Sequence, residues 1–364
     1  MRRIWPMIAL ICLASGAIAG DAPAEFRGIW VDAFHDGVKT PEQTTEMVNK
    51  VADANLNAIF VQVRARGDAY YNSEIVPKAG DIAVEYDPLA DVIQKAHAAG
   101  LQVHAWLNML EVTPRPIQAI SPQHITQSHP AWIMIDPAHS GKSRPKKYLD
   151  PAIPAVREHL SAVVREIVLK YPVDGIHVDA VRSHFAGGLL SDEGTAIYRA
   201  ATGNSDTGAG GPQWGAWWTE QATELMRQLS ASAKVRPGVA FSAAVTANRG
   251  AAKAHNLEDW ETWLREGIVD FAVPMLFSEG MFGAHLKTAL EASDGKMILA
   301  GQAAFDTTPE KSVEDIHAAR NANAGGVVIY SYCSASEGLL DQLKIEVYQE
   351  KVGLPALPLQ EVAQ

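Results

Sequence analysis

Short apolar runs alternate with amphipathic stretches along most of the chain. Eight runs rich in Val, Ile, Ala and Phe are typical of buried strands, and they occupy residues 27–33, 58–64, 101–108, 174–180, 239–247, 269–277, 296–302 and 325–332. The segments between them show helical periodicity. Apolar strands that alternate with helices indicate a parallel sheet covered on both faces. Eight such units predict an α/β fold, a (β/α)8 TIM barrel that forms a single domain.

The connections between these elements differ in length at the two ends of the predicted strands. Helix-to-strand connections such as "AAGLQ" are tight, whereas the strand-to-helix connections 65–86, 109–154 and 181–213 contain most of the additional residues. In a TIM barrel these long loops emerge at the C-terminal face, where active sites lie. The asymmetry therefore predicts a substrate cleft walled by long loops over the first four strands.

The two ends of the chain differ in character from this pattern. Residues 1–19 combine Arg2 and Arg3 with an apolar stretch and small residues, the layout of a signal peptide. The alternative is an uncleaved anchor, but the apolar run is 16 residues long from Ile4 to Ala19 and contains Pro6, so it is short for a membrane span. We therefore expect export with cleavage and no stable membrane insertion afterwards. Residues 20–352 then form the barrel, and 353–364 form a flexible tail.

Charge and composition narrow the classes of partner and chemistry. The formal charge is −11, and loss of residues 1–19 would change it to −13 because that segment contains two arginines and no acidic residue. Such a chain lacks the basic surface that nucleic-acid binding needs. A doubly wound open sheet is the alternative to the barrel, but no G-x-G-x-x-G follows the first strand. No G-x-S-x-G occurs, so a serine nucleophile is not expected. We expect no cofactor.

The segment "DGIHVDAVRS" (174–183) contains the first candidate for catalysis. Asp179 ends the fourth predicted strand and shares a strand face with His177. Placing such a charge at the end of a central strand is costly unless the charge is paired or used. Arg182, three residues on, is positioned to keep Asp179 ionised. We therefore predict that Asp179 is a catalytic carboxylate.

A glycosidase generally needs a second carboxyl group besides Asp179. Asp32 and Glu279 follow other strands and are the further candidates, with Glu279 favoured as the acid because it follows the apolar run "AVPMLF". Further strand-end and loop positions supply candidate substrate ligands, and aromatic residues near the rims suit a sugar ring, whose apolar face stacks on aromatic planes. These candidates are Arg64, Asp68, Trp106, Asn108, Asp150 and Tyr332. Asp150 could equally cap the helix that follows it.

A metal site is the less favoured alternative. His104, His177 and Asp179 come from neighbouring predicted strands and could together bind a metal ion in a hydrolase. However, the first strand lacks the His-x-His of metal-dependent amidohydrolase barrels, and no His-Glu-x-x-His occurs. A hydrogen-bonded core role for both histidines is the simpler interpretation, so no metal ion is expected.

Seven segments in order resemble the glycosyl hydrolase-like family 10 proteins, which are exported bacterial TIM-barrel proteins classed with glycoside hydrolases. They are "EFRGIWVDAFHDGVKTPEQ", "AIFVQVRARGDAYYNSEI", "HAWLN", "KYLDPAIPAVREHL", "VDGIHVDAVRS", "DWETWLREGIVDFAVPMLF" and "GGVVIYSY", within residues 25–335. By position, the resemblance marks Arg64, Arg66, Gly67, Asp68, Asn108, Asp150, Asp179 and Arg182. The chain departs from the family where Ala180 and Ser183 replace tyrosines and where Leu276-Phe277 replaces Asn-Tyr.

The resemblance implies an exported glycoside hydrolase that acts on a bacterial cell-wall or extracellular polysaccharide through paired carboxylates. Two alternatives remain at this point. One is a glycan-binding pseudo-enzyme on the same fold, because Asp179 is clear and its partner is not. The other is the metal-dependent hydrolase described above.

Overall fold

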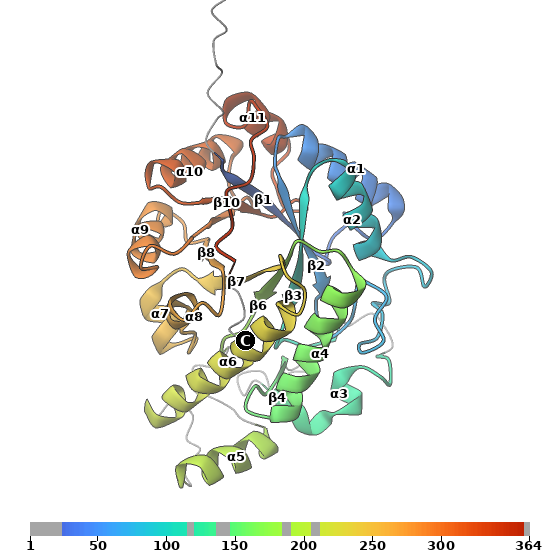
Figure 1. The fold of residues 1–364 in the computed structure, drawn as a ribbon, viewed down its shortest axis with the longest axis vertical. Coiled ribbons are helices and arrows are strands. Elements are labelled where there is room, and N and C mark those ends of the chain that lie inside the picture. The colour runs from blue at the N-terminus through green and yellow to red at the C-terminus, as the bar shows by residue number, and fades with distance from the viewer. Residues whose placement is uncertain (1–23, 115–119, 136–145, 184–190, 205–211, 360–364) are drawn as a thin grey trace, which may run out of the picture.

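The computed structural model describes residues 24–114, 120–135, 146–183, 191–204 and 212–359. Eight parallel strands close into one barrel in the order β1-β10-β9-β8-β7-β6-β3-β2 (Figure 1). The predicted strands and the predicted TIM barrel are thereby confirmed. The barrel strands are β1 (Phe26–Val31), β2 (Ala58–Arg64), β3 (Gln102–Asn108), β6 (Gly175–Asp179), β7 (Ala240–Thr246), β8 (Phe271–Leu276), β9 (Ala300–Ala303) and β10 (Gly326–Tyr330).

Helices surround the barrel (Figure 1). They are α1 (Pro41–Asp53), α2 (Pro88–Ala98), α4 (Pro154–Lys170), α6 (Pro212–Ala233), α7 (Arg249–Ala254), α8 (Trp260–Arg265), α9 (Phe282–Ala292), α10 (Pro309–Asn321) and α11 (Leu339–Glu346). Three of these helices start with proline after a capping side chain, namely Thr40, Asp87 or Thr308, which accepts a hydrogen bond from the first turn. Proline at the first helical position costs no hydrogen bond, and the cap satisfies an otherwise unpaired N–H group.

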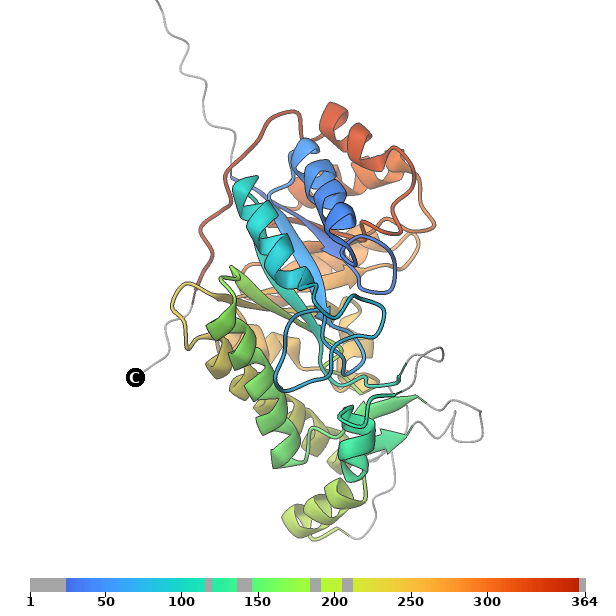
Figure 2. The ribbon, with the colours of Figure 1, turned by 90° about the vertical axis from the view of Figure 1, so that its right-hand side faces the viewer.

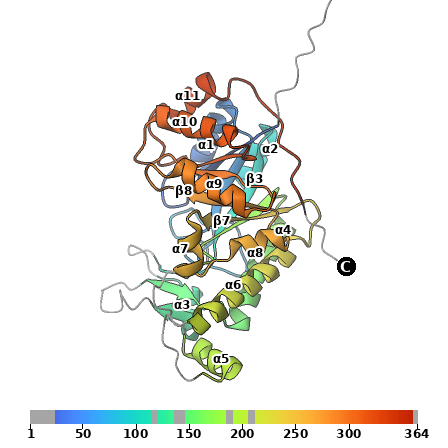
Figure 3. The ribbon, with the colours of Figure 1, turned by 90° about the vertical axis from the view of Figure 1, so that its left-hand side faces the viewer.

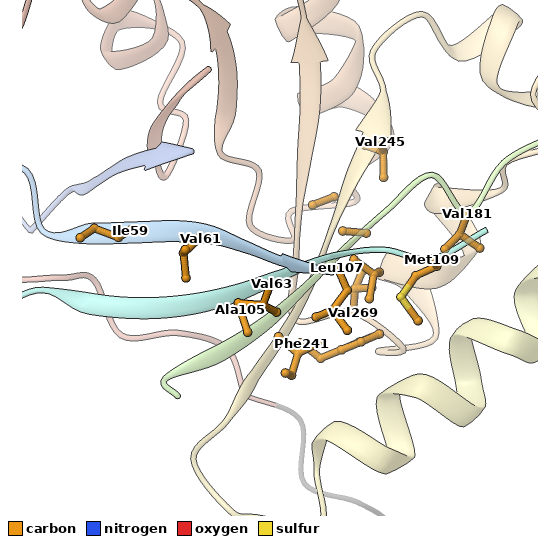
Figure 4. Packing of buried hydrophobic residues seen from close by; sticks show 14 of the residues in the cluster. Ile59, Val61, Val63, Ala105, Leu107, Met109, Val181, Phe241, Val245 and Val269 are labelled. Atoms are coloured by element: carbon orange, nitrogen blue, oxygen red, sulfur yellow. The ribbon is translucent and has the colours of Figure 1, made fainter. Parts of the chain in front are cut away.

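Alternate residues of each strand face two different apolar layers. Figure 4 shows part of the outer layer, where Ile59, Val61 and Val63 of β2 belong to the cluster shared with the helices. The opposite faces fill the barrel interior with a second cluster, which includes Phe26, Trp30, Phe60, Trp106 and Phe271. Full burial of one such side chain contributes about 1.5–3 kcal/mol. Strand ends are therefore held rigidly, and functional groups on them have fixed positions.

The long loops add structure beyond the C-terminal ends of β3 and β6, as predicted (Figure 2). The loop after β3 contains α3 (Ile125–Ser128), the 3-10 turn η1 (Pro130–Trp132) and an antiparallel pair formed by β4 (Ile133–Ile135) and β5 (Lys147–Leu149). The loop after β6 contains α5 (Asp192–Thr202). These elements form a wall at the end of the barrel where the candidate residues lie.

The C-terminal segment covers the other end of the barrel. Residues 351–359 have no regular secondary structure, yet Leu354 and Leu357 pack against the interior cluster. The backbone N–H of Glu25 donates to the carbonyl of Gly353 at 3.2 Å, which holds the segment beside β1. The predicted signal peptide (1–19) and the last residues of the predicted tail (360–364) lie outside the described residues. Within the described part of the chain, none of the helices combines the length and the apolar character that a membrane span requires.

Candidate active site

Asp179 ends β6 and faces the mouth of the barrel. In the register of β3 and β6, Asp179 pairs with Asn108, and His177 pairs with Trp106. The side chain of Asp179 is 15% exposed, and its Oδ1 accepts a hydrogen bond from Arg182 Nη1 at 3.0 Å. Among the described residues, Oδ2 has no hydrogen-bond partner. One carboxylate oxygen is therefore held in place while the other is available to a ligand.

Arg182 is a cation surrounded by acidic groups. Burial by itself lowers its pKa, but the carboxylates of Asp179 and Glu258, with a smaller contribution from Glu111, outweigh burial and raise the pKa of Arg182. Arg182 is therefore charged at any physiological pH. Its positive charge neutralises part of the acidic cluster and fixes the orientation of Asp179.

Glu258 is a carboxyl group of this site that the sequence analysis missed. Its side chain is 1% exposed, and its Oε2 accepts a hydrogen bond from the backbone N–H of Thr246, the last residue of β7, at 2.9 Å. Its Oε1 is buried without a hydrogen-bond partner among the described residues. Burial raises the pKa of Glu258, and Arg182 opposes this only in part. Glu258 therefore keeps its proton to a higher pH than an ordinary glutamate, as a general acid must.

The loop that contains Glu258 is hydrogen-bonded to the segment that follows the strand of Asp179. The backbone N–H of Ser183 donates to the carbonyl of Asn256 at 2.7 Å, and Asn256 Nδ2 donates to Thr246 Oγ1 at 2.7 Å. Glu258 follows α7 and lies immediately before the motif "DWETWLREGIVDFAVPMLF". The sequence signal for Glu258 was an acidic residue in the loop after the fifth barrel strand, and acidic loop residues are common enough that this position alone does not distinguish it.

Two polar atoms on β3 remain unpaired beside Asp179. Trp106 Nε1 and Asn108 Oδ1 are both buried without a hydrogen-bond partner among the described residues. Because buried polar groups are almost always paired, such atoms indicate a place for a ligand or water. A sugar hydroxyl is suited to both, since it accepts from an indole N–H and donates to an amide oxygen. This arrangement supports the predicted binding role of Trp106 and Asn108.

Tyr330, which the sequence analysis did not single out, completes an aromatic wall at the mouth. Its ring lies 6.1 Å from that of Trp106 and 5.4 Å from that of Phe277. Burial, with the negative charges of Asp32 and Asp179, raises the pKa of Tyr330 to about 12. The phenol is therefore neutral and able to donate a hydrogen bond. The sequence signal for Tyr330 was its place at the end of the eighth strand, two residues before the predicted Tyr332.

Asp32 differs from Asp179 because both of its carboxylate oxygens are used in hydrogen bonds that stabilise the local backbone. Its side chain is 1% exposed, and Oδ1 accepts from the N–H groups of Phe34 and His35 at 2.9 and 3.2 Å and contacts His35 Nδ1 at 2.8 Å. Its Oδ2 accepts from Ser331 Oγ at 3.0 Å. Both oxygens thus shape the turn after β1. This use of both oxygens leaves Asp32 less suited to proton transfer than Glu258.

Glu279 and Tyr332 line two separate cavities. Glu279 is exposed beside Phe277 and Phe305, between the ends of β8 and β9 and the helices α9 and α10. Tyr332 lies in a cavity with Lys50 and other residues of α1 and α11. β10 ends at Tyr330 and the chain then turns, so Tyr332 does not continue along the mouth. Among the described residues, neither Glu279 nor Tyr332 forms an ion pair or hydrogen bond with Asp179 or Arg182.

The residues of the "RARGD" motif support the mouth from the side of β2. Arg64 is fully buried, and its Nη1 donates to the carbonyls of Asn108 and, at 3.0 Å, Met109. Burial lowers the pKa of Arg64 to about 10, which still leaves it charged at neutral pH. The guanidinium of Arg66 lies 4.0 Å from the centre of the Phe34 ring, and its backbone N–H donates to Asp68 Oδ1 at 3.1 Å. Arg64 thus positions the end of β3, while Arg66 and Asp68 shape the following loop.

Asp150 links two of the long loops. It is fully buried, and its carboxylate accepts hydrogen bonds from the N–H of Ala152 at 3.0 Å and from the N–H and Oγ of Ser191 at 2.9 and 2.8 Å. Ser191 in turn caps α5 through the N–H of Gly194. Burial raises the pKa of Asp150. The hydrogen bonds indicate that Asp150 holds the wall together. The capping interpretation is wrong, because the N-cap of α4 is Ile153 and no side chain caps that helix.

His104 and His177 belong to the packed barrel interior. The ring of Phe60 stacks on His104 at 4.6 Å and contacts His177 at 4.8 Å, and His177 Nδ1 is 2.9 Å from Ser242 Oγ. Burial lowers the pKa of His104 to about 4 and that of His177 well below its usual value. Among the described residues, no group of three His, Cys, Asp or Glu side chains has the geometry of a metal site. The geometry supports core roles for both histidines.

Two known proteins are similar to this chain in sequence, and a solved structure is similar to it in fold. Glycosyl hydrolase DigH of Escherichia coli K12 is 29% identical over 254 residues, which cover 61% of this chain and 54% of DigH, so the chain spans about half the length of that relative. Glycosyl hydrolase YngK of Bacillus subtilis is 24% identical over 394 residues, covering 92% of this chain and 74% of YngK. The glycoside hydrolase domain of PgaB (BpsB) from Bordetella bronchiseptica has the same fold, with a TM-score of 0.63, 14% identity and coverage of 92% of this chain and 100% of that domain.

A family model decides the assignment. The model described as "Glycosyl hydrolase-like 10" matches residues 25–303, which include the barrel from β1 to β9 together with Asp179, Arg182 and Glu258. The match extends over more than half of the chain and agrees with the predicted resemblance. The chain belongs to the glycosyl hydrolase-like 10 family.

Proposed function

We propose that the protein is an exported glycoside hydrolase that cleaves a bacterial cell-wall or extracellular polysaccharide, using Asp179 and Glu258 as its carboxyl pair. The observation that carries this proposal is the environment of Asp179. One of its oxygens is held by Arg182, the other has no partner among the described residues, and two unpaired polar atoms of β3 lie beside it. A rigid strand end with an open carboxylate suits positioned catalysis.

The two carboxyl groups differ in a way that suits different roles. Asp179, held by a permanent cation, fits the nucleophile or the base that activates water. Glu258 is buried, its pKa is raised, and it is fixed to the end of β7, so it fits the acid that protonates the leaving oxygen. Because Glu258 is 1% exposed, its carboxyl group must become accessible to substrate before it can protonate a glycosidic oxygen.

Asp179→Asn and Glu258→Gln separate these roles once a panel of cell-wall and extracellular polysaccharides has identified a substrate. Each substitution should lower kcat by about 10²–10⁴-fold on the glycan, which is the usual contribution of a general acid or base to the rate. On a 4-nitrophenyl glycoside, whose leaving group needs no proton, Glu258→Gln should recover most of the loss while Asp179→Asn should not. Glu266→Gln, an exposed glutamate after α8, serves as the matched control.

The outcomes distinguish the candidate functions. Full turnover by Asp179→Asn would contradict the assignment of Asp179, and equal losses for Glu258→Gln on both substrates would contradict the acid role. The burial of Glu258 favours a second candidate, a glycan-binding protein without activity. Binding of a polysaccharide without release of any product by the wild-type chain would establish that alternative.

Export rests on residues 1–19 and is tested separately. Expression in a bacterium with fractionation should place a shortened chain outside the cytoplasm, and the mass of the purified protein should show cleavage near Ala19. A full-length chain that stays in the cytoplasm would contradict export without affecting the glycosidase proposal.

A further inference from the structure

A second cavity adjoins the mouth that contains Asp179. It has a volume of about 690 Å³ and lies at the C-terminal ends of β8 and β9, beside α9 and α10. These two helices contact each other on the outside of the barrel (Figure 3). The volume is in the range of known small-molecule sites. The catalytic roles proposed for Asp179 and Glu258 do not involve this cavity.

The cavity and the mouth share one aromatic wall. Phe277 and Phe305 line the cavity, and their ring centres lie 5.4 and 6.0 Å from that of Tyr330. Tyr330 in turn lies 6.1 Å from Trp106 and close enough to Asp179 for that charge to raise its pKa. A line of four aromatic rings therefore leads from the reaction centre into the cavity. Aromatic faces bind the apolar faces of sugar rings.

The charges of the cavity limit what it can bind. Glu279 and Asp306 are exposed at its edge and form no ion pair among the described residues. Lys311 is the one cation among the lining residues, and it is already paired with Asp315 and, at 3.7 Å, with Glu314. The lining thus has an excess of negative charge, which repels a carboxylate on a sugar.

From this geometry we infer that the cavity is a subsite that binds a further sugar unit of the same glycan chain, one without a carboxylate group. The inference rests on the proposed glycosidase function and adds to it. A substrate must then be long enough to occupy both the mouth and the cavity. The charge of the lining makes neutral or amino sugars the substrate class for this position and disfavours uronic acids.

Gly283 provides a way to fill the cavity. It lines the cavity near the start of α9, its φ is not positive, and a Cβ at this position would meet nothing within 4 Å. Gly283→Phe therefore adds a large side chain at the wall of the cavity, and its Cβ meets no neighbouring atom. Gly283→Ala is the matched control, because it changes the same position but leaves the cavity open.

The first experiment measures kcat/KM against oligosaccharide length for the wild type and both variants. In the wild type, kcat/KM should rise about tenfold when the oligosaccharide becomes long enough to reach the cavity, the worth of one aromatic–sugar contact. Gly283→Phe should abolish that rise and leave the shortest cleaved substrate unaffected, while Gly283→Ala should retain the rise. An equal loss at every length, or no loss at any length, would overturn the subsite.

The second experiment measures binding without turnover, so that failure of the glycosidase proposal can be recognised by itself. Calorimetry with uncut neutral, amino and uronic acid oligosaccharides should show weaker binding of the uronic acid series to the wild type. The double variant Glu279→Gln/Asp306→Asn should reduce this discrimination. If the wild type cleaves nothing but Gly283→Phe still weakens binding of long neutral oligosaccharides, the glycosidase proposal fails and the subsite remains. Equal binding of all three series by the wild type would overturn the proposed selectivity.

Discussion

The buried histidine His104 predicts a specific loss of stability in acid. It is fully buried among the rings of Phe26, Phe60 and Phe271, and burial lowers its pKa from 6.5 to about 4. A histidine with a depressed folded-state pKa contributes stability above pH 6.5, and this stability is lost as the pH falls towards 4, because only the unfolded chain then binds the proton. Each tenfold change in proton affinity is worth about 1.4 kcal/mol. The loss attributable to His104 is therefore about 2 kcal/mol at pH 5 and about 3 kcal/mol at pH 4.

The assay is the free energy of unfolding in urea at pH 7 and at pH 5 for the wild type, His104→Phe and His104→Gln. The drop between the two pH values should be about 2 kcal/mol smaller in both variants than in the wild type. The cost of the substitution itself cancels, since only the difference between pH values is compared. His255→Gln, an exposed histidine, should behave as the wild type. Equal drops in the wild type and both His104 variants would refute the reasoning and indicate that His104 is protonated at its ordinary pKa.

Two further predictions concern the loop wall and the absence of a metal requirement. In Gly194→Ala, the added Cβ would lie 2.1 Å from Asp150 Oδ2, so the variant should lose about 1–3 kcal/mol of stability, which thermal unfolding measures. The control Gly283→Ala, whose Cβ would lie in open space, should melt within about 2 °C of the wild type. An unchanged melting temperature of Gly194→Ala would contradict the expected clash with Asp150. Treatment with EDTA should leave the melting temperature and any glycan turnover unchanged, because His104 and His177 pack in the barrel interior. One tightly bound zinc ion per chain, with loss of turnover on chelation, would instead support the metal-dependent alternative.

The architecture could be predicted because it depends on local patterns. Each barrel strand is an apolar run of a few residues, and several helices begin after a capping side chain such as Thr40 or Asp87. Parallel strands joined by helices place their C-terminal ends on one face, so the end position of Asp179 followed from the pattern. Asp179 and Arg182, which form an ion pair, are also only three residues apart in the sequence.

The proposed partner of Asp179, Glu258, could not be predicted in the same way. Asp32 and Glu279 also follow strands, but the first is occupied by four hydrogen-bonding contacts and the second lies in a separate cavity. Glu258 lies in a loop after a short helix, a place without a periodic signal. Its position depends on the contact with Thr246 N–H and on the pairing of β6 with β7.

The sequence by itself determined the TIM barrel, the long loops on one face, the family resemblance and the location of Asp179 and Arg182, since each of these depends on neighbours in the chain. Only the tertiary structure decided that Glu258 joins them, that Tyr330 and not Tyr332 borders the mouth, and that His104 and His177 are packed between aromatic rings. The physical reason is that burial, pKa and the meeting of loops depend on contacts between residues that are distant in sequence, and no local pattern encodes those contacts.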